Sequence, residues 1–231
     1  YMTLLAAFKL LLSRFSGQED ICLGTFIANR GRTELEGIIG YFANTLPLRS
    51  SLAGDPLFSE FLARVDEVTK GAYSHQDLPF ERIVDEVAGA KSEDRQLINA
   101  AFVLQNAQES DDIALRLPGV DVSLYRDIDT TRVRFDLEVH MSEAGEQLDC
   151  QVIYRTDLFE RDTIISLIDT YTGLLAQICA DPAQPISFYA MTQEGDVSDM
   201  SDTESVDLDG LDIDNMSEEE LDKMLSQLGN D

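Results

Sequence analysis

Apolar residues recur three and four positions apart in several stretches of the chain, which is the spacing of helices that bury one face. The first such stretch covers residues 2–15. A long helix is expected after Asp55, which can cap it, with Pro56 at its first position. A shorter helix is expected near Pro79, and residues 159–178 again show the spacing of a helix.

Other stretches are rich in β-branched and apolar residues and predict strands. Residues 21–27 are almost entirely apolar, as in a strand buried on both faces, and residues 44–52 predict a second strand. Five further candidates follow in succession and predict antiparallel pairing: 100–105, 113–117, 120–125, 134–141 and 148–154. The expected fold class is therefore α/β, an α+β sandwich in which helices flank a mixed sheet.

The C-terminal segment differs from this body in charge. Residues 193–231 hold 14 acidic residues and one basic residue, so they carry −13 of the net charge of −27 and leave −14 on residues 1–192. Residues 193–216 contain few apolar residues that could compensate the entropy lost on ordering, so a flexible acidic linker is expected there.

An amphipathic helix is expected over residues 217–228. Ser217 and Glu220 have the spacing of a capping box, and Met216 and Leu221 have that of a hydrophobic staple. A helix this short needs a surface to stabilise it. We interpret it as a docking element, and the alternative is an inert solubilising tail. Its apolar stripe consists of Leu221, Met224, Leu225 and Leu228.

The charge balance argues against several classes of partner. The chain has 17 Lys and Arg against 44 Asp and Glu, with no basic cluster that could neutralise phosphates, so nucleic acid is not expected as a ligand. The longest apolar stretch, residues 2–12, is interrupted by Lys9, so neither a membrane span nor a signal peptide is expected. Cys22, Cys150 and Cys179 lie far apart and predict neither disulfides nor a zinc site; a cytoplasmic location is expected.

No complete active site is apparent from the residue types. The two histidines, His75 and His140, stand alone, and a lone histidine is more often structural than catalytic. Neighbouring acidic residues at 111–112 and 127–129 are typical of solvated loops, so no metal site is expected. The chain begins with Tyr1 and enters a helical pattern at once, which indicates a segment of a longer protein.

Two longer motifs are more specific. Residues 39–49 read I-G-Y-F-A-N-T-L-P-L-R, and residues 75–81 read H-Q-D-L-P-F-E. In order and spacing they resemble two core motifs of the condensation domains of nonribosomal peptide synthetases. The resemblance covers residues 1 to about 192, with supporting stretches at 11–20, 102–106, 135–137 and 154–159.

The resemblance implies a chloramphenicol-acetyltransferase-like fold of two halves, with this chain as the C-terminal half. The family's catalytic motif H-H-x-x-x-D-G is absent here, so no catalytic residue is expected in this chain and the segment alone should be inactive. In the family reaction, the amine of one carrier-bound aminoacyl group attacks the thioester of another carrier-bound chain. The implied partners are peptidyl or acyl carrier proteins with their phosphopantetheine arms and the N-terminal half; no cofactor is expected to bind directly.

Residue by residue, the resemblance implies modest roles. It places Asn44 and Thr45 at the substrate tunnel; the alternative for Asn44 is an asparagine that caps backbone groups. Arg49 could pair with a carboxylate across the two halves, or it could be a solvated strand arginine.

The second motif precedes a proline that prepares the next helix. His75, Gln76 and Asp77 are therefore expected to hold that helix entry and the adjoining loop between the halves. Asp136 matches a family position near the tunnel, and a structural hydrogen bond is the alternative.

The chain departs from the family at residues 91–101, where only fragments of the motif R-D-x-S-R-N-P-L remain. Three hypotheses stay open. The first is half of an amide-forming condensation domain, whose acidic tail resembles segments that dock a downstream synthetase subunit. The second is a degenerate, non-catalytic domain that recruits other proteins, and the third, weaker one is a free-standing acyltransferase.

Overall fold

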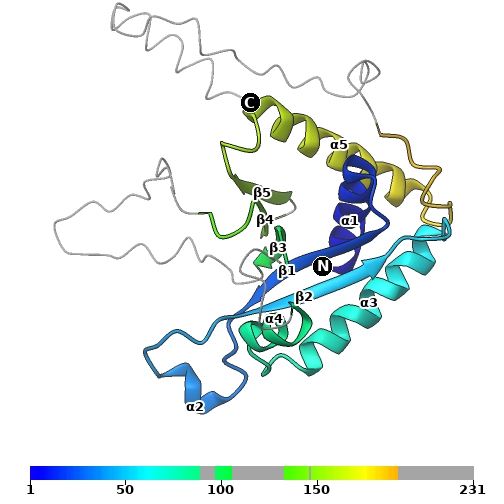
Figure 1. The fold of residues 1–231 in the computed structure, drawn as a ribbon. Coiled ribbons are helices and arrows are strands. Elements are labelled where there is room, and N and C mark those ends of the chain that lie inside the picture. Colours follow the sequence, from blue (N-terminus) through cyan, green and yellow to red (C-terminus); the bar gives the residue numbers. More distant parts are fainter. Residues whose placement is uncertain (89–96, 106–132, 146, 192–231) are drawn as a thin grey trace, which may run out of the picture. The chain divides into compact units, whose positions relative to one another are not determined.

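The computed structural model describes residues 1–88, 97–105, 133–145 and 147–191 of the chain. In these ranges, helices lie against a five-stranded sheet (Figure 1). The helices are α1 Met2–Ser16, α2 Thr33–Glu36, α3 Phe58–Ser74, α4 Phe80–Ala88 and α5 Arg161–Ala180. The strands are β1 Asp20–Ile27, β2 Asn44–Ser51, β3 Ala100–Gln105, β4 Leu137–Ala144 and β5 Gln147–Tyr154.

The sheet is mixed, as predicted, with strand order β2-β1-β3-β4-β5. Strand β1 is antiparallel to β2 and parallel to β3, and β4 is antiparallel to β5. The prediction of antiparallel pairing from β3 onward is wrong for β3 and β4, which are parallel. Residues 106–136 separate them, and a connection of this length permits the crossover that parallel strands require. The strand candidates at 113–117 and 120–125 lie outside the described residues.

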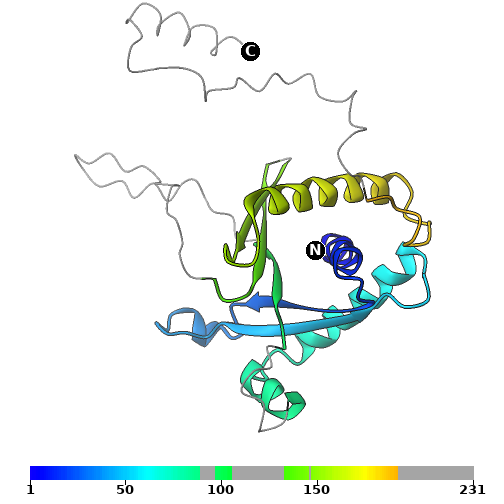
Figure 2. The same ribbon diagram turned by 45° about the horizontal axis from the view of Figure 1, so that its top comes forward.

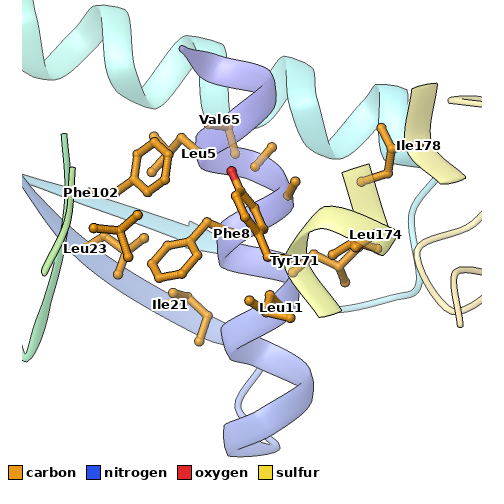
Figure 3. Close-up of a cluster of buried hydrophobic side chains, with 14 of the residues drawn as sticks. Leu5, Phe8, Leu11, Ile21, Leu23, Val65, Phe102, Tyr171, Leu174 and Ile178 are labelled. Carbon is orange, nitrogen blue, oxygen red and sulfur yellow. The ribbon is translucent and has the colours of Figure 1, made fainter. Parts of the chain in front are cut away.

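The large helices pack together on one face of the sheet (Figure 2). Helix α1 contacts α3, α5 and β1, and α3 also packs on β2. Phe8 of α1 lies at the centre, with its ring 5.3 Å from Phe102 of β3 and 5.7 Å from Tyr171 of α5. Figure 3 shows these rings among buried side chains from α1, β1, α3 and α5. The helical spacing of residues 2–15 thus produces the predicted buried face.

One charged residue lies within this core. Lys9 is fully buried, and its Nζ donates hydrogen bonds to the carbonyl oxygen of Leu48 at 2.8 Å and to Oγ of Ser50 at 2.7 Å. Burial disfavours the charged form and lowers the pKa of Lys9 to about 8. Lys9, which interrupts the apolar stretch in the sequence, therefore joins α1 to β2 through hydrogen bonds.

The start of α3 differs from the prediction. Asp55 has a positive φ of 48° and does not cap the helix, which begins at Phe58. Its carboxylate instead accepts hydrogen bonds from the backbone N–H of Ser187 at 2.8 Å and from the Ser187 hydroxyl at 2.7 Å. Because both oxygens are engaged by a segment distant in sequence, they are not available to the helix N-terminus. Asp55 thus attaches the segment after α5 to the loop before α3.

Helix α5 is long and apolar enough, by length and composition, to cross a membrane. However, its apolar face lies in the core, where Ile164, Leu167, Tyr171, Leu174 and Ile178 are buried. Packing against α1 therefore accounts for its composition. The predicted linker at 193–216 and docking helix at 217–228 lie outside the described residues.

Candidate functional site

The two sequence motifs meet at one cavity of about 310 Å³. The cavity lies where β1 ends and β2 begins, next to the start of α4. The first motif supplies Tyr41 to Thr45, and the second supplies Asp77 and Pro79 to Glu81, together with Asn29 from the loop after β1. Two segments more than thirty residues apart in the sequence thus form one site.

Asn44 joins these two segments through its carboxamide. Its Nδ2 donates hydrogen bonds to the carbonyl oxygens of Gln76 at 2.9 Å and Leu78 at 2.8 Å. Its Oδ1 accepts the backbone N–H groups of Phe80 at 3.1 Å and Thr45 at 2.9 Å. The side chain therefore satisfies the first N–H of α4 and holds the preceding loop against β2. This geometry corresponds to the backbone-capping alternative, while the tunnel-lining role of Asn44 stays a prediction.

The remaining polar side chains around the cavity are the carboxamide of Asn29 and several hydroxyl and carboxylate groups. Tyr41, Asp77 and Glu81 are exposed, and Thr45 is half-buried. The described lining includes no basic side chain. The cavity can therefore accept hydrogen bonds from amide or amine N–H groups, and its described residues contain no histidine that could act as a general base.

His75 and Gln76 lie outside this cavity, in the turn after α3. The Nδ1 atom of His75 is 2.9 Å from the carbonyl oxygen of Gly71 and 2.9 Å from Oγ of Ser74. Gln76 presents its backbone carbonyl to Asn44. Both residues lie in the turn between α3 and α4, and their role in holding the entry to α4 stays a prediction.

Arg49 pairs with a carboxylate of this chain. Its Nη2 is 2.6 Å from Oδ2 of Asp20, which lies on the neighbouring strand β1. The hydrogen bond from Arg49 lowers the pKa of the Asp20 carboxyl. Both side chains are largely exposed. Within this chain Arg49 thus pairs with a carboxylate on the adjacent strand, and a pairing across the two halves stays a prediction.

Asp136 lies apart from the motif cavity, at the opposite end of the sheet. Its carboxylate accepts hydrogen bonds from Nδ2 of Asn99 at 3.1 Å and from Nη1 of Arg155 at 3.2 Å. Asn99 and Asp136 line a second, mainly apolar cavity of about 640 Å³ at the starts of β1, β3 and β4. The structure therefore does not bring Asp136 together with Asn44 and Thr45.

His140 contacts a buried carboxylate. Its Nε2 is 3.2 Å from Oε2 of Glu138, whose Oε1 accepts the backbone N–H groups of Arg134 at 2.9 Å and Phe135 at 3.3 Å. Glu138 thereby orders the turn that precedes β4. In the described ranges, no three His, Cys, Asp or Glu side chains gather as a possible metal site.

Arg30 is a residue that the sequence reasoning missed. Its guanidinium binds three backbone carbonyls of the loop between β1 and β2 and lies over the ring of Phe42, which lines the motif cavity. In the sequence it lies in a polar turn beside a second arginine, Arg32, and no local signal distinguishes the two.

Known proteins with similar sequences belong to one family of large synthetases. The family model of the condensation domain matches residues 1–201. A linear gramicidin synthase chain of Brevibacillus parabrevis is 42% identical over 195 residues, which are 84% of this chain and 4% of that protein. Surfactin synthase subunit 1 of Bacillus subtilis (strain 168) is 38% identical over 197 residues, which are 84% of this chain and 5% of that protein.

Solved structures show the same fold. The X-domain from teicoplanin biosynthesis superposes with a TM-score of 0.69 and 28% identity, covering 83% of this chain and 44% of that chain. The four-domain nonribosomal peptide synthetase holo-AB3403 has a TM-score of 0.72 and 19% identity, covering 84% of this chain and 16% of that chain. The chain thus spans a small part of the synthetases that it matches. With its mixed sheet, its two converging motifs and this family match, the chain belongs to the condensation-domain family of nonribosomal peptide synthetases.

Proposed function

We propose that the chain is the C-terminal half of a condensation domain that forms an amide bond between two carrier-bound substrates. The donor is an acyl or peptidyl group and the acceptor is an aminoacyl group, each carried on the phosphopantetheine arm of a carrier protein. The catalytic histidines come from the other half of the domain, since this chain has no H-H-x-x-x-D-G motif.

The observation that carries this proposal is the convergence of the two motifs. Residues 39–49 and 75–81 are the segments with the strongest family pattern, and residues 41–45, 77 and 79–81 from them line one cavity. Asn44 fixes their relative position through three hydrogen bonds to backbone groups of the second motif. A surface shaped in this way supports a role in positioning substrate rather than in proton transfer.

The reaction itself defines what this half must provide. The acceptor amine nitrogen attacks the thioester carbonyl carbon, the C–N bond forms, the C–S bond breaks, and the amine proton and the thiolate leave as a thiol. The negative charge that develops on the carbonyl oxygen needs hydrogen-bond donors, and the amine needs alignment. The exposed oxygen atoms at the motif cavity can accept N–H bonds, which suits the alignment of an amine or amide.

The acidic tail is proposed to dock a downstream synthetase subunit. Residues 193–216 would act as the linker and residues 217–228 as the docking helix, with Leu221, Met224, Leu225 and Leu228 on its apolar face. Like charge on residues 1–192 disfavours binding of this tail to its own body, so its partner should offer a basic, apolar-lined groove. The free cysteines at 22, 150 and 179 suit a cytoplasmic location.

A second candidate function is recruitment without catalysis. It is favoured by the similarity to the teicoplanin X-domain, which has been solved in complex with OxyB. The departure from the family pattern at residues 91–101 also favours it. In that case the domain would hold a tailoring enzyme or a carrier protein in place.

A single-turnover assay on the full-length parent protein separates the two functions. Two loaded carrier proteins are mixed with wild-type protein and with a variant of the upstream histidine motif, and amide product is measured. Histidine-dependent product is the result expected for a condensation domain. Binding of both carriers without any product would overturn the amide-forming proposal and favour recruitment.

A further inference from the structure

The connection between β1 and β2 is unusually long for two antiparallel neighbours. Such strands can be joined by a two-residue turn, whereas here residues 28–43, including α2, separate them. Figures 1 and 2 show this loop extending beyond the ends of both strands, away from α1 and α5. Long loops of this kind commonly carry function.

The tip of the loop presents apolar side chains to solvent. Ile39 is fully exposed at 102%, Tyr41 is 77% exposed and Ile38 is 48% exposed. We call these three residues the apolar tip. Adjacent exposed apolar side chains are unfavourable in water unless another surface covers them.

Arg30 connects several parts of this loop to one another. Its Nη1 donates hydrogen bonds to the carbonyl oxygens of Leu35 and, at 2.9 Å, of Ile38, and its Nη2 donates to that of Gly40 at 3.1 Å. Its guanidinium carbon lies 4.5 Å from the centre of the Phe42 ring. A planar guanidinium can make all these contacts together, and a lysine ammonium cannot reproduce the geometry.

We propose that Arg30 is a positioning residue that holds the apolar tip ready to dock on the part of the condensation domain outside this chain. This inference rests on the proposed function, because it assumes that a complete domain forms. The same contacts fix Phe42, and Tyr41 and Phe42 both line the motif cavity. Arg30 therefore couples the docking surface to the wall of the candidate site.

The character of the tip favours this partner over a carrier protein or a second copy. The three side chains of the tip carry no charge, and permanent interfaces are more apolar than transient ones. The chain also covers only 44% of the solved X-domain, so further polypeptide of the same domain is available to cover the tip. Preorganisation by Arg30 lowers the entropy that docking would otherwise cost.

The first test examines the loop within this chain. Hydrogen exchange of peptides covering residues 35–42 is compared in wild type, Arg30→Met, Arg30→Lys and the control Arg32→Met. We expect at least tenfold faster exchange in both Arg30 variants, with β1 and β2 unchanged. Arg32→Met removes the same charge two residues away and should exchange as wild type. Unchanged exchange in Arg30→Met would overturn the positioning role.

The second test examines what covers the tip. Hydroxyl-radical footprinting of Ile39 and Tyr41 is compared in this chain and in the complete condensation domain. In the complete domain we expect the oxidation of Ile39 and Tyr41 to fall at least fivefold. The variant Ile39→Asp should lose part of this protection at Tyr41. Ile165→Asp, at an exposed position on α5, should not. Equal oxidation in the two proteins, or protection in this chain that rises with its concentration, would overturn the proposed partner.

These results are distinguishable from failure of the proposed function. A complete domain that protects the tip but makes no amide contradicts the catalytic proposal and leaves the docking inference intact. A domain that makes amide with an unprotected tip contradicts the docking inference alone.

Discussion

The carboxamide of Asn44 accepts the backbone N–H of Phe80 at 3.1 Å, so a residue at the start of β2 caps a helix that begins 36 positions later. The same side chain holds two carbonyls of the preceding loop. One residue of the first motif therefore explains why the second motif adopts its conformation. Its loss should affect both the stability of the chain and the shape of the motif cavity.

We predict that Asn44→Ala lowers the free energy of unfolding by about 1–3 kcal/mol, because several backbone groups lose their partner. Asn44→Asp keeps the acceptor for Phe80 but faces the carbonyls of Gln76 and Leu78 with a carboxylate, so it should also destabilise. Urea denaturation measures both. Gln76→Ala is the control, since it retains the backbone carbonyl that Asn44 binds. A stability of Asn44→Ala equal to wild type would contradict the capping role.

Lys9 should give the chain a distinctive dependence of stability on pH. Its pKa is about 8 in the folded chain and 10.5 in the unfolded chain, so between these values the unfolded state binds more protons. Stability from this group therefore rises with pH from about 8, by about 1 kcal/mol per pH unit at most, and the full penalty of the buried charge is present below 8. Above about 9, the raised pKa values of the Cys22 and Cys150 thiols oppose the rise.

The measurement is the difference in unfolding free energy between wild type and Lys9→Met at pH 7, 8 and 9. Comparison with this variant cancels the contribution of Cys150, but Lys9 lowers the pKa of Cys22, so the values at pH 7 and 8, where the thiols stay protonated, decide the test. The exposed Lys70, which pairs with Asp66, provides the control Lys70→Met and should show no such difference. Parallel pH profiles for wild type and Lys9→Met would contradict the lowered pKa.

Tyr171 should contribute both packing and a hydrogen bond to the core. Its ring packs on Phe8, and its hydroxyl donates to the carbonyl oxygen of Leu4 at 2.9 Å. We predict that Tyr171→Phe costs about 1 kcal/mol and Tyr171→Ala about 3–5 kcal/mol. Thermal and urea unfolding test this, with Ile165→Ala on the exposed side of α5 as control. Equal costs for the Phe and Ala variants would show that the hydroxyl, rather than the ring, carries the contribution.

The docking role proposed for the tail predicts a separable defect. Leu221→Asp combined with Leu225→Asp should abolish binding to the downstream subunit while the unfolding midpoint of the body stays unchanged. Gln227→Ala is the control within the same segment. Binding should also weaken as salt rises, because the tail is strongly acidic. Subunit binding that survives the double substitution would refute the docking proposal.

The local periodicity of the sequence was sufficient to predict α1, the five strands of the described residues and the helical character of residues 159–178, because burial of one face imposes spacings of two or three to four residues. The two motifs were sufficient to indicate the family, which the comparisons confirm. Partnerships between distant residues were not accessible in the same way. Asp55 was expected to cap α3, but Ser187 engages it, and Arg49 pairs with Asp20 on the neighbouring strand.

The structure alone decided three features, and each depends on which segments the topology brings together. The parallel pairing of β3 and β4 is one of them, because strand propensity is the same for either direction. The buried Lys9 donates hydrogen bonds to acceptors on β2, and Arg30 donates to carbonyl oxygens of its own loop. The sequence by itself determined most of the described helices and strands and the family to which the chain belongs. The tertiary structure decided which polar groups meet, because hydrogen bonds depend on distances that exist only after folding.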